Sequence, residues 1–132
     1  MRRPRDLPPS LDDLAQIGRD QIATIPEPFR KHFRDVVIRV DEFCDEAVER
    51  EMDLESPFDL LGLYRGVSLD RKSVMASASD VDMIFLYRRP ILDYWCETGE
   101  DLEHVVRHVL VHEIGHHFGL GDDDMQHIEE DE

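Results

Sequence analysis

Residues 109–122 read Val109-Leu-Val-His-Glu-Ile-Gly-His-His-Phe-Gly-Leu-Gly-Asp122 and contain the pattern H-E-x-x-H between His112 and His116. Side chains four positions apart lie one above the other on an α-helix, so these two imidazoles would face a single point. Two imidazoles with this spacing suit two of the four tetrahedral positions around a zinc ion. The stretch therefore predicts a helix that carries a metal site.

The residues that surround the two histidines indicate a catalytic metal site. Glu113 is turned by about 100° from the preceding histidine, which makes it a poor ligand but a suitable base for a water that the metal polarises. Gly119 allows the helix to end in a left-handed turn, after which Asp122 can supply a third ligand, in competition with Asp123 and Asp124. Three protein ligands would leave a fourth position open for water and substrate.

The helix that carries the motif is expected to begin after Thr98, which forms a capping-box pattern with Asp101, and to run to about Phe118. Its metal end is apolar on nearly all sides, so we expect the motif histidines to be buried. Buried imidazoles cost free energy unless something binds them, which favours their role as ligands. His108 and His104, one and two turns earlier, are expected to lie on the surface. The far side of the first turns is polar and is expected to face water: Glu100, Glu103 and Arg107.

The composition describes a single acidic domain. The chain has 132 residues, with 31 acidic and 15 basic side chains and a formal net charge of -16. This length supports one hydrophobic core but not two, so residues 10–132 are assigned to one domain and the Pro- and Arg-rich residues 1–9 to a flexible tail. A surface this acidic repels phosphate backbones and argues against nucleic acid as a partner.

Targeting signals and cysteine usage point to the cytoplasm. No apolar run approaches the roughly 20 residues that span a bilayer, so no membrane association is expected. The basic N-terminus is not followed by the apolar stretch of a secretory signal. Cys44 and Cys96 are far apart in the sequence and form no C-x-x-C pair, so both are expected to be reduced and at least half-buried.

The rest of the chain alternates short helices and strands. Ser10 and Asp13 form a capping-box pattern ahead of a helical apolar stripe that ends before Pro26. Strands are predicted by β-branched or continuous apolar runs at 36–40, at 60–67 (a strand or hairpin) and at 82–88. Further helices are expected at 29–34, 41–52, 91–96 and from 122 onward. A mobile loop is expected at 68–80, and the whole pattern predicts an α+β fold.

Three stretches of this sequence resemble the small bacterial zincin-like metallopeptidases. They are Leu61-Gly-Leu-Tyr-Arg-Gly66, Ile84-Phe-Leu-Tyr-Arg-Arg-Pro90 and His108-Val-Leu-Val-His-Glu-Ile-Gly-His-His-Phe-Gly-Leu120. The resemblance extends over the chain from about residue 10 onward. It implies a zincin-like α+β fold, with N-terminal helices and a small mixed sheet of three to four strands packed on a central active-site helix.

The resemblance also implies functional residues. It implies a zinc ion (Zn2+) as cofactor, with His112, His116 and Asp122 as its ligands and Glu113 as the general base. It assigns residues 82–88 to the strand that pairs antiparallel with extended substrate in zincins. The related metzincins have a third histidine as ligand and a downstream methionine turn. This chain has Asp122 in place of that histidine, and Met125 lies too close to be that turn.

The predicted function is zinc-dependent hydrolysis of peptide bonds in peptides or unfolded proteins, with a metal-bound water activated by Glu113. One alternative is a non-catalytic module of the same fold that binds metal or a partner, and a partner protein could also complete the cleft of so small an enzyme. A metal-dependent ribonuclease is less favoured, because it would need a basic surface. The oxyanion of the reaction needs a donor, for which the sequence leaves five candidates: Tyr64, Tyr87, Arg88, Tyr94 and His117.

Overall fold

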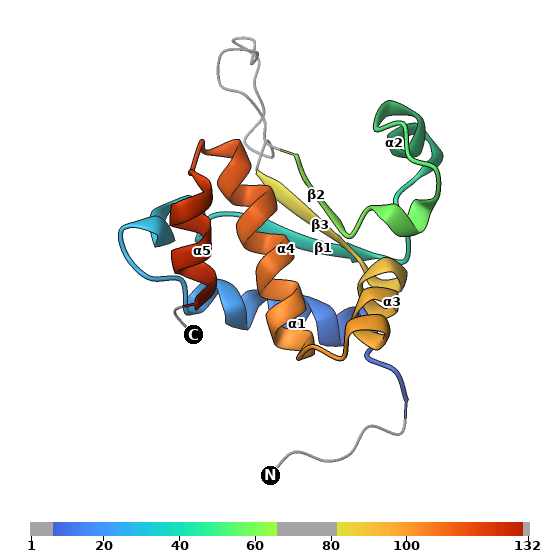
Figure 1. Ribbon diagram of the computed structural model, residues 1–132, viewed down its shortest axis with the longest axis horizontal. Coiled ribbons are helices and arrows are strands. Elements are labelled where there is room, and N and C mark those ends of the chain that lie inside the picture. The colour runs from blue at the N-terminus through green and yellow to red at the C-terminus, as the bar shows by residue number, and fades with distance from the viewer. Residues whose placement is uncertain (1–6, 66–81, 131–132) are drawn as a thin grey trace.

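The computed structural model describes residues 7–65 and 82–130, which form five α-helices and a three-stranded sheet (Figure 1). The elements follow one another in this order: α1 (Leu11–Ala23), the 3-10 helix η1 (Phe29–His32), β1 (Val37–Asp41), α2 (Glu46–Glu51), the 3-10 helix η2 (Pro57–Asp59), β2 (Gly62–Arg65), β3 (Met83–Tyr87), α3 (Arg88–Thr98), α4 (Leu102–His117) and α5 (Asp122–Glu130). This arrangement confirms the predicted α+β class. The loop expected at 68–80 and the first six residues of the expected tail lie outside the described residues.

The sheet has the strand order β1-β3-β2, with β3 in the centre. β1 is parallel to β3 and β2 is antiparallel to it. Substrate pairing by residues 82–88, which the resemblance implied, is therefore wrong for this chain, because both edges of β3 already bond to neighbouring strands. Within residues 7–65 and 82–130, β2 is an edge strand of the sheet, and it is in contact with α4.

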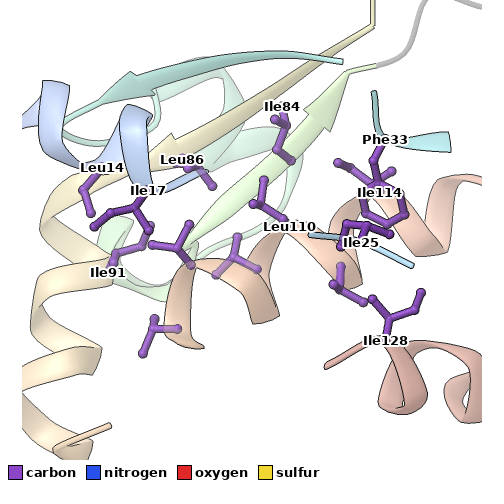
Figure 2. Close-up of a cluster of buried hydrophobic side chains, with 14 of the residues drawn as sticks. Leu14, Ile17, Ile25, Phe33, Ile84, Leu86, Ile91, Leu110, Ile114 and Ile128 are labelled. Atoms are coloured by element: carbon purple, nitrogen blue, oxygen red, sulfur yellow. The ribbon is translucent and has the colours of Figure 1, made fainter. Parts of the chain in front are cut away.

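Side chains of β3 alternate between two apolar clusters on opposite faces of the sheet. Ile84 and Leu86 belong to the main core, where side chains from α1, α3, α4 and α5 meet the sheet (Figure 2). Phe85 and Tyr87 belong to a smaller cluster with Val48 of α2. In Figure 1, α1, α4 and α5 accordingly lie together, while α2 lies apart from them. Helix α4 is thus held between the sheet, α1 and α5.

Helix α1 begins where the sequence predicts it. The Ser10 hydroxyl accepts a hydrogen bond from the Asp13 N–H at 3.0 Å, and the Asp13 carboxylate accepts one from the Ser10 N–H at 2.9 Å. This reciprocal capping box satisfies two amide donors that no helical carbonyl can reach. Just before it, Pro9 is buried, and its carbonyl accepts a hydrogen bond from Nε of Arg88 at 2.6 Å.

The long helix begins later than predicted. Thr98 is the last residue of α3, Gly99 follows with φ of 73°, and Asp101 is the N-cap residue of α4 without a side-chain hydrogen bond. The capping-box interpretation of Thr98 and Asp101 is therefore wrong. The helix expected at 91–96 is longer than predicted, because it also includes Pro90. Proline is tolerated in the first turn of a helix, where a backbone N–H would have no helical carbonyl to bond to.

Arg107 was expected to face water, and this expectation is wrong. Its side chain is 1% exposed, the largest fully buried side chain in the described part of the protein. The guanidinium donates to the Ile128 carbonyl at 2.8 Å, to the Gln21 side chain at 3.1 Å and to the Thr24 hydroxyl at 2.6 Å. The sequence pattern missed this burial because α5 and the end of α1 cover a side of α4 that periodicity alone classed as polar.

The two cysteines are free thiols in different environments. Cys44 is buried as expected, and burial together with the charges of Glu49 and Asp45 raises the pKa of its thiol. Cys96 is exposed, contrary to expectation. Among the described residues, no helix combines the length and apolar character needed to cross a membrane.

Candidate metal centre

Helix α4 ends in the left-handed turn that the sequence predicts. Gly119 has φ of 75°, and its N–H donates to the His116 carbonyl at 3.2 Å. The Leu120 N–H donates to the Gly115 carbonyl at 2.9 Å. This pair of bonds is the Schellman motif. It turns the chain sharply at the end of the H-E-x-x-H segment, so that α5 runs back along α4 (Figure 1).

The two motif histidines lie one turn apart near the end of α4, and their ring centroids are 5.9 Å apart. His112 is half-buried, with a side chain that is 33% exposed, and His116 is exposed. The prediction of a buried histidine pair is therefore wrong. Neighbouring Ile114 and Gly115 are buried instead, so this turn directs its apolar side chains inward and its imidazoles toward the surface.

Glu113 lies between α4 and the edge strand β2. The backbone N–H of Tyr64 lies near enough to its carboxylate to lower the pKa of that group. Burial raises the pKa of Glu113, and this effect outweighs the opposing influence of His116, the Tyr64 N–H and His112. A carboxyl whose pKa is raised is a stronger base than an exposed glutamate, which is a property that general-base catalysis uses.

The orientation of the Tyr64 N–H follows from the strand register. The Leu61 carbonyl accepts a hydrogen bond from the Tyr87 N–H at 3.0 Å, so odd-numbered residues of this segment bond to β3. Backbone groups alternate in direction along a strand. The N–H of Tyr64 therefore points away from β3, toward the outer edge of the sheet and the side on which Glu113 lies.

Aromatic side chains line the region next to this edge. The ring of Tyr64 lies 4.2 Å from that of His117, and His32 stacks on Phe118 at 4.6 Å, all between ring centroids. The Tyr64 hydroxyl is buried and has no hydrogen-bond partner among the described residues. Burial and the nearby Asp82 carboxylate raise the pKa of this hydroxyl, so it stays protonated and able to donate.

The five oxyanion candidates lie in different parts of the molecule. Tyr64 and His117 lie beside the motif. Tyr87 packs in the smaller cluster on the other face of the sheet. Arg88 donates to Glu42 and the Pro9 carbonyl, and Tyr94 lies on α3 with its hydroxyl donating to Glu100. The structure thus places two of the five candidates, whose rings are 4.2 Å apart, beside the H-E-x-x-H segment.

Asp122, the predicted third ligand, is the first residue of α5. Together with Asp123 and Asp124 it forms an exposed acidic first turn, a position that the helix dipole favours for negative charge. Imidazole nitrogens and carboxylate oxygens on adjoining ends of two helices are donors that zinc accepts. These residue types suit zinc, but the three close donors among the described residues belong to His108, His112 and Glu129 and not to His112, His116 and Asp122.

A methionine packs beneath the motif. Met125 of α5 is 1% exposed, and a Cβ atom added at Gly115 would lie 2.8 Å from its sulfur. Met125 is too close in sequence to form the methionine turn of metzincins, yet it supports the same turn of helix from below. A larger residue at Gly115, the second variable position of the motif, would collide with the Met125 side chain.

Sequence reasoning missed Glu129. Its carboxylate lies 2.6 Å from Nδ1 of His108 and 2.8 Å from Nε2 of His112. Met125 and Ile128 are buried, which turns the neighbouring Glu129 toward α4. The apolar spacing of Met125 and Ile128 was the available signal, because it identifies the face of α5 that packs on the metal-site helix.

A model of the zincin-like metallopeptidase family matches residues 33–131, which is most of the chain. The match includes β1, β2, β3 and the helices that carry the histidines and both candidate carboxylates. A comparison with curated proteins found no match for this chain.

Proposed function

Because the chain belongs to the zincin-like metallopeptidase family, we propose that it is a zinc-dependent peptidase that hydrolyses peptide bonds. His112, His116 and Asp122 hold the metal, and Glu113 is the general base. Zinc, when bound, lowers the pKa of water and polarises a carbonyl. The observation that carries the proposal is the position of Glu113, which directly follows His112 in the motif and lies half-buried beside the backbone of Tyr64 in β2.

Glu113 has the protonation behaviour that this role needs. Its carboxylate takes a proton from the attacking water and passes it to the leaving amine. Burial raises the pKa of this carboxyl, which strengthens it as a base and makes its protonated form a usable acid in the second step. Tyr64 and His117, the two candidates that lie beside the motif, supply the donor for the oxyanion.

The substrate is an extended segment of polypeptide. The outward-facing edge of β2 lies next to Glu113, and an extended chain adds to such an edge by backbone hydrogen bonds. Unfolded proteins and flexible peptides present that conformation without a cost of local unfolding. Backbone pairing is also indifferent to side-chain identity, which suits a domain with few walls for a deep specificity pocket.

The test is the substitution Glu113→Gln, assayed on a fluorogenic unstructured polypeptide in the presence of zinc. We expect the variant to bind zinc as the wild type does and to lose turnover by about 100-fold or more, because only proton transfer is removed. Glu103→Gln, on the same helix three turns earlier, is the control and should retain activity. Zinc binding with no hydrolysis by the wild type would instead support the non-catalytic module.

A further inference from the structure

A second group of metal-binding side chains lies beside the predicted centre. The donor atoms of His108, His112 and Glu129 all lie within 4.8 Å of one another. His108 and His112 are four residues apart, the same spacing as the motif pair, and their ring centroids are 4.2 Å apart. That separation is shorter than the 5.9 Å between His112 and His116. His112 therefore belongs to two overlapping histidine pairs, and its ring lies closer to that of His108 than to that of His116.

The carboxylate of Glu129 is held in place by the packing of α5. Ile128 is fully buried, and its carbonyl accepts hydrogen bonds from the guanidinium of Arg107. This fixes the rotation of α5 about its axis and directs the next side chain at the two imidazoles. The Glu129 side chain is only 15% exposed, so it is partly desolvated before any ion arrives. A partly buried carboxylate shared by two imidazoles is a preorganised set of ligands.

We infer that His108, His112 and Glu129 form a second metal site, which competes with the H-E-x-x-H pair for His112. Nε2 of His112 faces Glu129 in this arrangement, so the nitrogen cannot bind an ion on the His116 side at the same time. An ion between His108 and Glu129 lies on a different side of α4 from Glu113, because position 113 is turned by about 140° from position 108. Metal held there is therefore withdrawn from the general base.

An ion bound at this site would replace both imidazole–carboxylate hydrogen bonds, because the ring nitrogens and the carboxylate oxygens that form them are the atoms that would bind it. The metal site itself does not depend on the proposed peptidase activity. Only its consequence, the diversion of zinc from a catalytic position, rests on the proposed function.

The test removes the motif histidine that the second site does not use. Zinc chloride is titrated by calorimetry into full-length His116→Ala, His108→Ala/His116→Ala and, as a matched control, His104→Ala/His116→Ala. We expect His116→Ala to bind one zinc ion. Loss of His108 in that background should weaken binding by about 10-fold or more, whereas loss of His104, one turn earlier, should leave it unchanged. All three positions are at least partly exposed, and circular dichroism checks the fold.

Two outcomes would overturn the inference. If His116→Ala binds no zinc, Glu129 only orients His112 by a hydrogen bond. If loss of His104 weakens binding as much as loss of His108, the binding is unspecific. Glu129→Gln in the His116→Ala background is an independent variant, and it should also weaken binding about 10-fold or more. None of these measurements uses hydrolysis, so the proposed function stands or falls separately, on the effect of Glu113→Gln in the wild-type background.

Discussion

Two adjacent residues of α5 contact two very different sides of α4. The Ile128 carbonyl accepts hydrogen bonds from Arg107, whose side chain is buried with its donors directed at three partners. The neighbouring Glu129 carboxylate contacts His108 and His112, which remain half-exposed and one-third exposed. One side of the helix is a closed polar junction, and the other is a partly open row of imidazoles.

The buried Arg107 and the partly exposed histidines show two uses of polar side chains on α4: one stabilises the fold, and the other is available to bind a metal. A buried charge is tolerated when every donor is satisfied, and it then fixes the elements that surround it. Arg107 does this by joining α1 and α5 to α4. The histidines keep access to solvent and make few contacts, so they are available to a metal. Burial of a polar residue on α4 therefore indicates architecture, and partial exposure beside a carboxylate indicates function.

Substitution of Arg107 should give the largest effect on stability. Arg107→Ala leaves the Ile128 carbonyl and the polar side chains of Gln21 and Thr24 without their donor and opens a cavity, so we expect a loss of about 3 kcal/mol in the free energy of unfolding. Urea unfolding followed by circular dichroism measures it. Arg107→Met fills most of the volume and should lose less. A loss below about 1 kcal/mol for Arg107→Ala would remove the basis of the comparison.

A methyl group added where the sheet meets α4 should give an intermediate effect. A Cβ atom at Gly62 would lie 2.4 Å from Cγ1 of Val109 and 3.0 Å from the Phe85 carbonyl oxygen. Gly62→Ala should therefore destabilise the protein by about 1–3 kcal/mol. The double variant with Val109→Ala should lose less than the sum of the two single losses.

Gly121→Ala is the control for this overpacking, because nothing lies within 4 Å of its added Cβ. Equal stability losses for Gly62→Ala and Gly121→Ala, measured by urea unfolding, would show that close packing of β2 on this side of α4 is not what the glycine provides.

Substitution on the histidine side should give the smallest effect. His108→Ala removes one contact between partly exposed groups, so in the presence of a chelator we expect a change within about 1 kcal/mol. Thermal unfolding of His108→Ala beside His104→Ala measures it. A loss as large as that of Arg107→Ala would make His108 a second structural residue, and the division between the two sides of α4 would disappear.

Local patterns predicted the elements well where the cause of structure is local. The Ser10–Asp13 cap, the strand at 82–88 and the turn at Gly119 each depend on residues within one or two turns, and all three are present. The candidate Glu113 and the two motif histidines could likewise be named from spacing on one helix. The start of α4 was misplaced because Thr98 and Asp101 satisfy a capping pattern that the left-handed Gly99 interrupts.

The remaining features depend on contacts between distant segments. Glu129 lies 17 residues from His112 in sequence, and only the turn at Gly119 brings the two together. The burial of Arg107 requires Gln21, which is 86 residues away. The edge position of β2 depends on the parallel pairing of β1 with β3, and no periodicity in either strand specifies its neighbour.

The amino-acid order alone therefore determined the α+β class, the helix with two imidazoles and a carboxylate in register, and the turn that follows it, because each arises from hydrogen bonds and side-chain spacing along a short segment. Only the tertiary structure decided which polar groups are buried, which strand borders Glu113 and which carboxylate reaches the histidines. Those properties are set by which surfaces exclude water from one another, and that exclusion exists only once the elements have packed.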